Sequence, residues 1–233
     1  MRTIMTIDAG TTGVTALLVD ERGGLTGRGY AEFPQHFPRP GWVEHDGEEI
    51  MAALRTACAT ALEDGGIEAA DLTAIGITNQ RETTLLWDRE TGRPIHNGIV
   101  WQDRRTAGVC DRLREAGHDA AIRDTTGLVV DAYFSGTKIA WMLDRVDGAR
   151  AMAEEGRLAF GTVDTWVISC LTGGASHVTE PSNACRTMLY DIDRADWSPR
   201  MAELLRVPMS VLPELRPSVG SFGTTDPDAF FGA

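Results

Sequence analysis

The chain has few cysteines, no long apolar run and no excess of positive charge, and each lack excludes a class of protein. Its four cysteines are widely spaced, without a Cys-x-x-Cys pair, so neither a disulfide framework nor a zinc site is indicated. No apolar run approaches the roughly 18 residues of a membrane span, and the N-terminus lacks a signal-peptide pattern. The formal net charge of −12 argues against non-specific nucleic-acid binding. We therefore expect a cytoplasmic protein without a membrane span or a nucleic-acid partner.

What is present fits one large globular domain with strands and helices in layers. The 233 residues are 42% hydrophobic, enough for a sizeable core, and contain no repeat or linker. Apolar runs and turn residues predict strands over residues 3–7, 14–19, 29–33, 72–78, 84–87 and 95–100, with 72–78 buried. A helix is expected from a cap at Asp46 to a stop at Gly65-Gly66. Further helices are expected over residues 105–115, 135–145, 149–155 and 199–205.

These elements predict a mixed α/β architecture in which a mixed sheet is covered by flanking helices. Residues 220–233 look like an edge strand or a loop, without a helix or cap to finish the fold. We interpret that end as a truncation or a domain boundary.

The sequence Asp-Ala-Gly-Thr-Thr-Gly, residues 8–13, joins the first two predicted strands and suits phosphate binding. Glycines allow close approach of the backbone, and exposed N–H groups and the hydroxyls of Thr11 and Thr12 can donate to a phosphate. Asp8 can hold a hydrated magnesium ion. The same residues also form ordinary tight turns, so the local pattern leaves both interpretations open.

A second candidate site follows the strand over residues 72–78, where open α/β sheets place their ligand residues. Arg81 and Glu82, flanked by Asn79 and Gln80, offer donors and acceptors suited to hydroxyl groups. The alternative is a solvated turn with an exposed ion pair.

Two aromatic residues also follow apolar segments. Trp101 can form an apolar wall for a carbon chain, or simply pack in the core. Tyr133 precedes a predicted helix with Lys138, where Ser135 is a candidate cap, and its phenol can reach a ligand hydroxyl or pack.

Three other polar residues are assigned no chemistry. Asp164 is interpreted as a helix N-cap after a strand, because the following apolar residues have helical spacing. His45 and His177 have no partner of the catalytic or metal-ligand type.

An ordered series of motifs nearly spans the chain and resembles the N-terminal domain of glycerol kinases, within the FGGY carbohydrate kinase family. The matching stretches are PGWVEHD (40–46), AIGITNQRETT (74–84), TGRPIHNGIVWQDRRTA (91–107), YFSGTKIAW (133–141), FGTVDTW (160–166) and HVTEPSNACRTML (177–189). The resemblance implies a ribonuclease-H-like fold of the actin, hexokinase and Hsp70 superfamily.

The resemblance also implies a function and roles for the candidate residues. The expected reaction transfers a phosphoryl group from ATP, with Mg²⁺, to glycerol, giving sn-glycerol 3-phosphate. Arg81, Glu82 and Tyr133 match residues that bind glycerol hydroxyls, and Trp101 matches the apolar wall. Asp8 matches the magnesium-positioning acid, and Thr11 to Gly13 match the segment that holds the nucleotide phosphates.

The hairpin departs from the family pattern. Members commonly have DQGTTSSR where this chain has DAGTTGVT, so Gly13 and Val14 replace serines and Thr15 replaces an arginine. Loss of these side-chain donors predicts weaker nucleotide binding, since each charge-assisted hydrogen bond contributes about 1.5–3 kcal/mol.

Family enzymes are about twice as long, and their second domain carries the adenosine pocket and the aspartate that acts as general base. Residues 1–233 are therefore expected to form the N-terminal domain, with no catalytic base and negligible activity alone, and the full-length protein is expected to be a homo-oligomer. Two alternatives remain: another FGGY sugar or polyol kinase, and a non-catalytic lone-domain binding protein.

Overall fold

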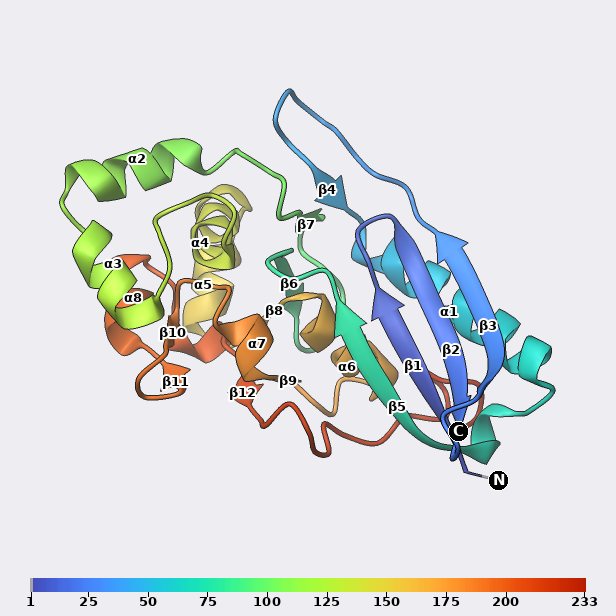
Figure 1. Cartoon of the computed structure of the whole chain (residues 1–233). Coiled ribbons are helices and arrows are strands. Elements are labelled where there is room, and N and C mark those ends of the chain that lie inside the picture. Colours follow the sequence, from blue (N-terminus) through green and yellow to red (C-terminus); the bar gives the residue numbers. More distant parts are fainter. Residues whose placement is uncertain (1) are drawn as a thin grey trace.

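The computed structural model, which describes residues 2–233, has a sheet on one side and a helix-rich part on the other (Figure 1). The strand order of this main sheet is β3-β2-β1-β5. Its members are β1 (Thr3–Ala9), β2 (Gly13–Asp20), β3 (Leu25–Glu32) and β5 (Leu72–Asn79). β2 pairs antiparallel with both β1 and β3, whereas β5 runs parallel to β1. The predicted meander and mixed sheet are confirmed.

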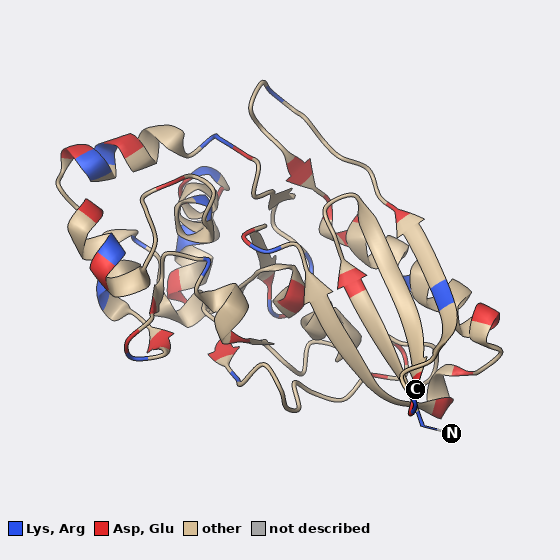
Figure 2. Ribbon diagram, viewed as in Figure 1, with Lys and Arg blue, Asp and Glu red and all other residues tan. Residues whose placement is uncertain are grey.

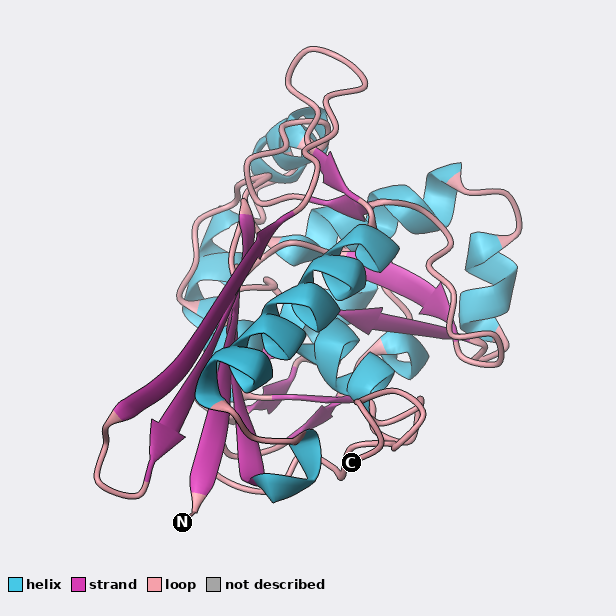
Figure 3. Ribbon diagram, turned by 90° about the vertical axis from the view of Figure 1, so that its right-hand side faces the viewer, coloured by secondary structure: helices cyan, strands magenta, loops and turns pink. Residues whose placement is uncertain are grey.

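Helix α1 (Gly47–Gly65) covers one face of this sheet (Figure 3). The Asp46 carboxylate accepts the Glu48 N–H at 2.8 Å, and the helix ends at Gly66 with φ of 63°, so both predicted signals are confirmed. Close contact of α1 with β3 requires glycine, because a Cβ on Gly29 would lie 1.9 Å from the Ala57 carbonyl oxygen.

Strand β5 was expected to be buried, and this expectation is wrong. Its residues are half-buried or exposed along the whole strand. The reason is its place at the edge of the main sheet: β1 pairs with one side, and no strand within residues 2–233 pairs with the other.

The helix-rich part holds a second hydrophobic core, centred on residues such as Ile139, Phe160 and Leu189. Its helices are α2 (Ala107–Glu115), α3 (Asp119–Thr126), α4 (Ser135–Arg145), α5 (Ala149–Glu154), α6 (Val163–Leu171), α7 (Pro181–Ala184) and α8 (Pro199–Leu204). Helix α6 lies between the two parts and also contacts α1 and β5. No helix within the described residues combines the length and apolar character needed to cross a membrane.

Between these helices, eight short strands form four two-stranded sheets. The pairs are β4 (Glu44–His45) with β7 (Gly98–Ile99), β6 (Leu85–Asp88) with β8 (Leu158–Gly161), β9 (Val178–Thr179) with β12 (Glu214–Leu215), and β10 (Tyr190–Asp191) with β11 (Asp196–Trp197). Single 3-10 turns span Ala69–Asp71 and Met209–Val211. The strand expected over residues 95–100 is reduced to β7, because irregular backbone leads into it.

Residues 220–233 form the expected loop rather than a strand. The Asp226 N–H donates to the Leu171 carbonyl at 2.8 Å, and Phe230 is buried in the core formed by the main sheet and α1. The segment therefore packs back onto the domain.

Candidate functional site

The β1–β2 hairpin presents an open face opposite α1. Asp8 lies in register with Thr15 on β2 and Thr78 on β5, so the three residues point to the same face of the sheet. The neighbouring residues Ile7 and Ala9 point to the other face and are buried. The carboxylate therefore lies between two hydroxyl-bearing residues on a surface that a ligand can reach.

Asp8 is the one acid of β1, and the other acid on this face, Glu32, lies on the outer strand β3 in register with Gly13. The main sheet carries few charged residues, and most Asp and Glu lie elsewhere (Figure 2). No cluster of three or more His, Cys, Asp or Glu suited to a metal occurs among residues 2–233. A lone carboxylate fits Mg²⁺, which usually keeps several waters and takes its other ligands from substrate phosphates.

Gly13 is required by packing. A Cβ at this position would lie 2.6 Å from the Ala31 carbonyl oxygen and 2.8 Å from the Tyr30 hydroxyl. Gly13 also closes the turn, since its carbonyl accepts the Gly10 N–H at 3.0 Å. A serine at this position would therefore need a shift of β3.

Trp101 connects the hairpin to the helix-rich part. Its indole Nε1–H donates to the Thr11 hydroxyl at 3.0 Å, and its ring meets Tyr133 edge-on with centroids 5.7 Å apart. Because an indole N–H only donates, Thr11 Oγ1 is the acceptor, and its own proton remains available for an anion. Trp101 is only partly buried, which separates it from an ordinary core residue.

Glu82 is buried and already has a charged partner. Its carboxylate accepts from Arg186 Nε at 2.6 Å, and the Arg186 guanidinium lies 5.5 Å from the centre of the Tyr133 ring. Glu82 also adopts a left-handed backbone with φ of 63°, which costs a non-glycine residue about 1–2 kcal/mol. One carboxylate oxygen, Oε2, is left for a ligand hydroxyl.

Arg186 is the residue of this cluster that sequence reasoning missed. It is 104 positions from Glu82, and nothing in its local sequence marks it as an ion-pair partner. The available signal was its place in the motif over residues 177–189.

The first turn of α4 holds the backbone of Glu82. Ser135 was a candidate cap, but the N-cap is Phe134, and the Ser135 hydroxyl instead donates to the Glu82 carbonyl at 3.1 Å. Lys138 Nζ donates to the same oxygen at 3.1 Å and to the Tyr133 carbonyl at 2.7 Å. Complete burial lowers the pKa of Lys138 to about 7, with the Glu82 charge acting in the opposite direction.

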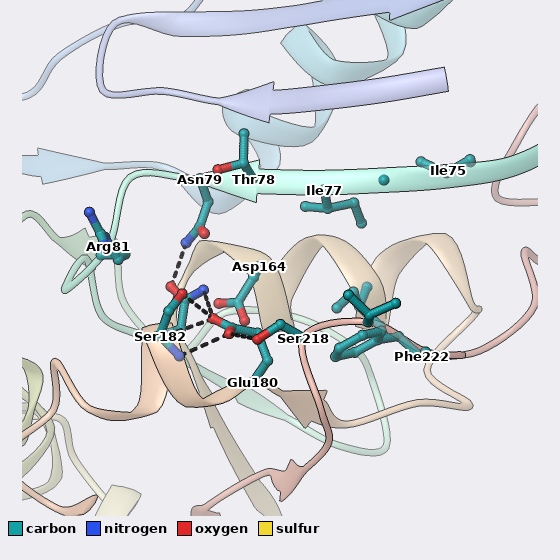
Figure 4. Close-up of a pocket in the computed structure, with 15 residues that line it drawn as sticks. Ile75, Ile77, Thr78, Asn79, Arg81, Asp164, Glu180, Ser182, Ser218 and Phe222 are labelled. Carbon is teal, nitrogen blue, oxygen red and sulfur yellow. Dashed lines mark hydrogen bonds between the residues drawn. The ribbon is translucent and has the colours of Figure 1, made fainter. Parts of the chain in front are cut away.

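Arg81 lies apart from the other predicted glycerol residues. Its side chain is exposed and borders a cavity of about 590 Å³ beside β5, together with Asn79, Glu180 and Asn183 (Figure 4). Glu82, Trp101 and Tyr133 do not line this cavity. The structure thus brings Glu82, Trp101 and Tyr133 together and places the Arg81 side chain at the neighbouring cavity.

Gln80 links the end of β5 to the hairpin. Its Nε2 donates to the Gly10 carbonyl at 3.0 Å and to His45 Nδ1 at 3.2 Å, and its Oε1 accepts from Thr83 at 2.7 Å. Burial, with a smaller effect of the His36 charge, lowers the pKa of His45 to about 4. A neutral His45 is therefore part of the support of the site.

Asp164 and His177 make hydrogen bonds within the protein, and Asp164 is not the predicted N-cap. Thr162 is the N-cap of α6, and Asp164 lies in its first turn, where it accepts from the Thr162 and Thr179 hydroxyls. Burial raises the pKa of Asp164. His177 contacts the Phe160 carbonyl, and burial lowers its pKa to about 4.

Comparison with known proteins gives a consistent set of relatives. A family model described as "FGGY family of carbohydrate kinases, N-terminal domain" matches residues 3–233. A glycerol kinase of Halorhodospira halophila is 56% identical over 232 residues, which is 100% of this chain and 46% of that protein. A glycerol kinase 2 of Thermotoga maritima is 51% identical over 99% of this chain and 46% of its own length. The chain thus spans about half the length of the curated relatives it matches.

Solved structures agree with this result. A crystal structure of Plasmodium falciparum glycerol kinase with ADP superposes with a TM-score of 0.90 at 33% identity, covering 99% of this chain and 47% of that one. A xylulose kinase from Rhodospirillum rubrum superposes with a TM-score of 0.86 at 21% identity over 98% of this chain and 45% of that one, which shows the shared fold alone. The expected fold is confirmed, and the chain belongs to the FGGY family of carbohydrate kinases.

Proposed function

We propose that the complete protein transfers a phosphoryl group from ATP to a terminal hydroxyl of glycerol, giving sn-glycerol 3-phosphate. Identity above 50% to glycerol kinases over the whole chain supports this substrate. The observation that carries the proposal is the Trp101 hydrogen bond to Thr11, which joins the phosphate hairpin to the Glu82 and Tyr133 cluster. Such contact fits a reaction in which a polyol and a phosphate must meet.

The polyol half-site would use four side chains. Glu82 Oε2 accepts from one glycerol hydroxyl, and the Tyr133 phenol and the Arg81 guanidinium bind others. Trp101 packs against the carbon chain. Because Arg81 is exposed, its contact with glycerol requires its flexible side chain to turn from the cavity toward Glu82.

The phosphate half-site would use the hairpin. The hydroxyls of Thr11 and Thr12 and the backbone of Gly13 hold nucleotide phosphates, while Asp8 holds Mg²⁺ through its water shell. When bound, the metal neutralises charge on the phosphates. Asp8 and Thr12 are exposed, as such contacts require.

The chain supplies no catalytic base in this proposal. The base and the adenosine pocket are assigned to a second, C-terminal domain, so residues 1–233 alone should have negligible kinase activity. We further propose that the full-length protein is a cytoplasmic homo-oligomer.

The first test is isothermal titration of glycerol, and separately of Mg-ADP, into the purified chain. Arg81→Ala should weaken glycerol binding at least tenfold, because one charge-assisted hydrogen bond contributes about 1.5–3 kcal/mol. Arg2→Ala is a matched control, since Arg2 is also exposed but lies at the opposite end of β1. Unchanged affinity in Arg81→Ala would contradict the assignment of Arg81.

A chimera tests the substrate class. The chain is joined to the part of the Halorhodospira halophila glycerol kinase that it does not match, and product formation is measured with glycerol, xylulose, gluconate and other polyols. Preference for glycerol supports the proposal, and preference for a sugar favours another FGGY kinase. A glycerol kinase rate from the chain alone close to that of the chimera would contradict the need for a second domain.

A further inference from the structure

Lys138 is the only lysine in the sequence, and it is fully buried. The other 21 basic residues are arginines, whereas the exposed fraction of Lys138 is 0%. No carboxylate within residues 2–233 forms an ion pair with it. Burial of an amine without a carboxylate partner is unfavourable, so packing alone would favour methionine or leucine here.

The amine has two acceptors, and both are main-chain carbonyls of residues in the proposed glycerol site. Nζ lies 3.1 Å from the Glu82 oxygen and 2.7 Å from the Tyr133 oxygen. A neutral amine has two N–H donors and an ammonium has three, so either form satisfies both carbonyls. Arginine has a larger planar group that is always charged and carries five N–H donors. The two carbonyls here would leave most of these donors without an acceptor.

The Glu82 backbone needs such support. Its φ of 63° is unusual for a residue with a side chain. Its carbonyl also accepts from the hydroxyls of Thr84 at 3.0 Å and Ser135 at 3.1 Å. Of these three donors, Lys138 is the one that also bonds to the second site residue, Tyr133.

We propose that Lys138 is a positioning residue whose Nζ bridges the Glu82 and Tyr133 carbonyls and thereby sets the spacing and orientation of the two side chains that receive glycerol. The role of these side chains rests on the proposed function. The bridge itself is a property of the fold and can be tested without glycerol.

The main variant is Lys138→Met, which keeps the apolar stem and removes the amine. Without the bridge, Glu82 relaxes and its ion pair with Arg186 weakens. We expect glycerol affinity to fall about tenfold, because the two side chains that receive glycerol lose their fixed spacing. We also expect the downfield Arg186 Nε–H signal of ¹⁵N-arginine-labelled protein to move toward the position of free guanidinium groups.

Leu143→Ala is the matched control, because Leu143 is buried on the same helix, five residues after Lys138 and near the other end of α4. It should lower thermal stability while leaving glycerol affinity and the Arg186 signal unchanged. Lys138→Arg should behave like Lys138→Met, because it restores charge without the geometry of the bridge.

The outcomes separate this inference from the proposed function. If the unmodified chain binds glycerol, equal affinity in Lys138→Met overturns the inference. If the unmodified chain binds no glycerol, the proposed glycerol site is contradicted, and the Arg186 signal of Lys138→Met tests the bridge alone. A shift of that signal supports the bridge, and an unchanged signal overturns it. Should Lys138→Met not fold, Lys138→Leu, which also removes the amine, takes its place; an unmoved Arg186 signal there overturns the inference, and a shift supports it.

Discussion

The two halves of the candidate site are built in opposite ways. On the hairpin, Asp8 and Thr12 are exposed, and Asp8 has no ion-pair partner among the described residues. In the helix-rich part, Glu82 is buried against Arg186, and Lys138 is buried against two carbonyls. The hairpin leaves its polar groups open, whereas the other half pairs most of its own within the protein and leaves Glu82 Oε2 and the exposed Arg81 for a ligand.

This difference matches the ligands proposed for each half. Phosphates and Mg²⁺ bring their own charge and water, so the hairpin needs accessible donors and one carboxylate. Glycerol is neutral and small, and its recognition depends on hydrogen-bonding groups held in fixed positions. A pre-arranged buried network provides that order before the ligand binds.

The largest effect should come from breaking the buried pair. Arg186→Ala leaves the Glu82 carboxylate buried without its partner, which should lower the free energy of unfolding by about 3 kcal/mol. Asp8→Ala should change it by less than about 0.5 kcal/mol, because Asp8 is exposed. Urea unfolding of the chain measures both.

Arg194→Ala serves as the control for loss of an arginine, since Arg194 is exposed in the same part of the molecule. If Arg186→Ala and Arg194→Ala had equal free energies of unfolding, burial of Glu82 would not depend on its ion pair with Arg186. The proposed difference between a buried and an open half of the site would then be wrong.

Acid should lower the free energy of unfolding through His45, which bonds to Gln80 between the two halves. Its folded pKa of about 4 lies below the ordinary value of 6.5, so the unfolded state binds the proton more tightly. The resulting stability is fully present above pH 6.5 and is lost as pH falls toward 4, by at most about 3 kcal/mol. The cause is physical: a protonated Nδ1 can no longer accept from Gln80 Nε2.

His45→Phe removes this titration and should flatten the pH dependence of the unfolding free energy between pH 4 and 6.5, although its stability at neutral pH is lower. His177 shifts in the same direction and leaves a residual slope. An unchanged slope in His45→Phe would show that His45 does not titrate in this window.

Packing of the hairpin gives a smaller effect. Gly13→Ser should lower the free energy of unfolding by about 2 kcal/mol, because its Cβ would lie 2.6 Å from the Ala31 carbonyl oxygen. Gly76→Ser is the matched control, since a Cβ on Gly76 meets nothing within 4 Å. Thermal unfolding compares the two, and equal melting temperatures would show that β3 adapts to the serine at no cost.

The same contrast explains what the sequence could predict. The meander, α1 and the hairpin depend on local signals: alternating apolar residues, the Asp46 cap and the Gly66 stop. Their residues lie close together in sequence, so periodicity and capping suffice to place them.

The helix-rich part depends on contacts between distant residues. Glu82 meets Arg186 across 104 positions, and Ser135 and Asp164 have partners that no local pattern reveals. The local expectation of caps at Ser135 and Asp164 was therefore wrong. The exposure of β5 was missed for a related reason, because an apolar strand looks the same at an edge as at the centre of a sheet.

The smallest predicted effect concerns nucleotide affinity at the hairpin. Thr15 lies in register with Asp8 and shares its open face, so an arginine there reaches a phosphate held by the hairpin. Thr15→Arg should bind Mg-ADP about tenfold more tightly, equivalent to about 1.5 kcal/mol from one charge-assisted hydrogen bond. Leu17→Arg is the matched control: it adds the same charge to the same face of β2, two residues further from the turn. If both variants gained affinity equally, the effect would be a general gain of positive charge. If Thr15→Arg gained none, a side chain at position 15 would not reach the bound phosphates, and the departure from the family pattern at Thr15 would not explain a weaker nucleotide affinity.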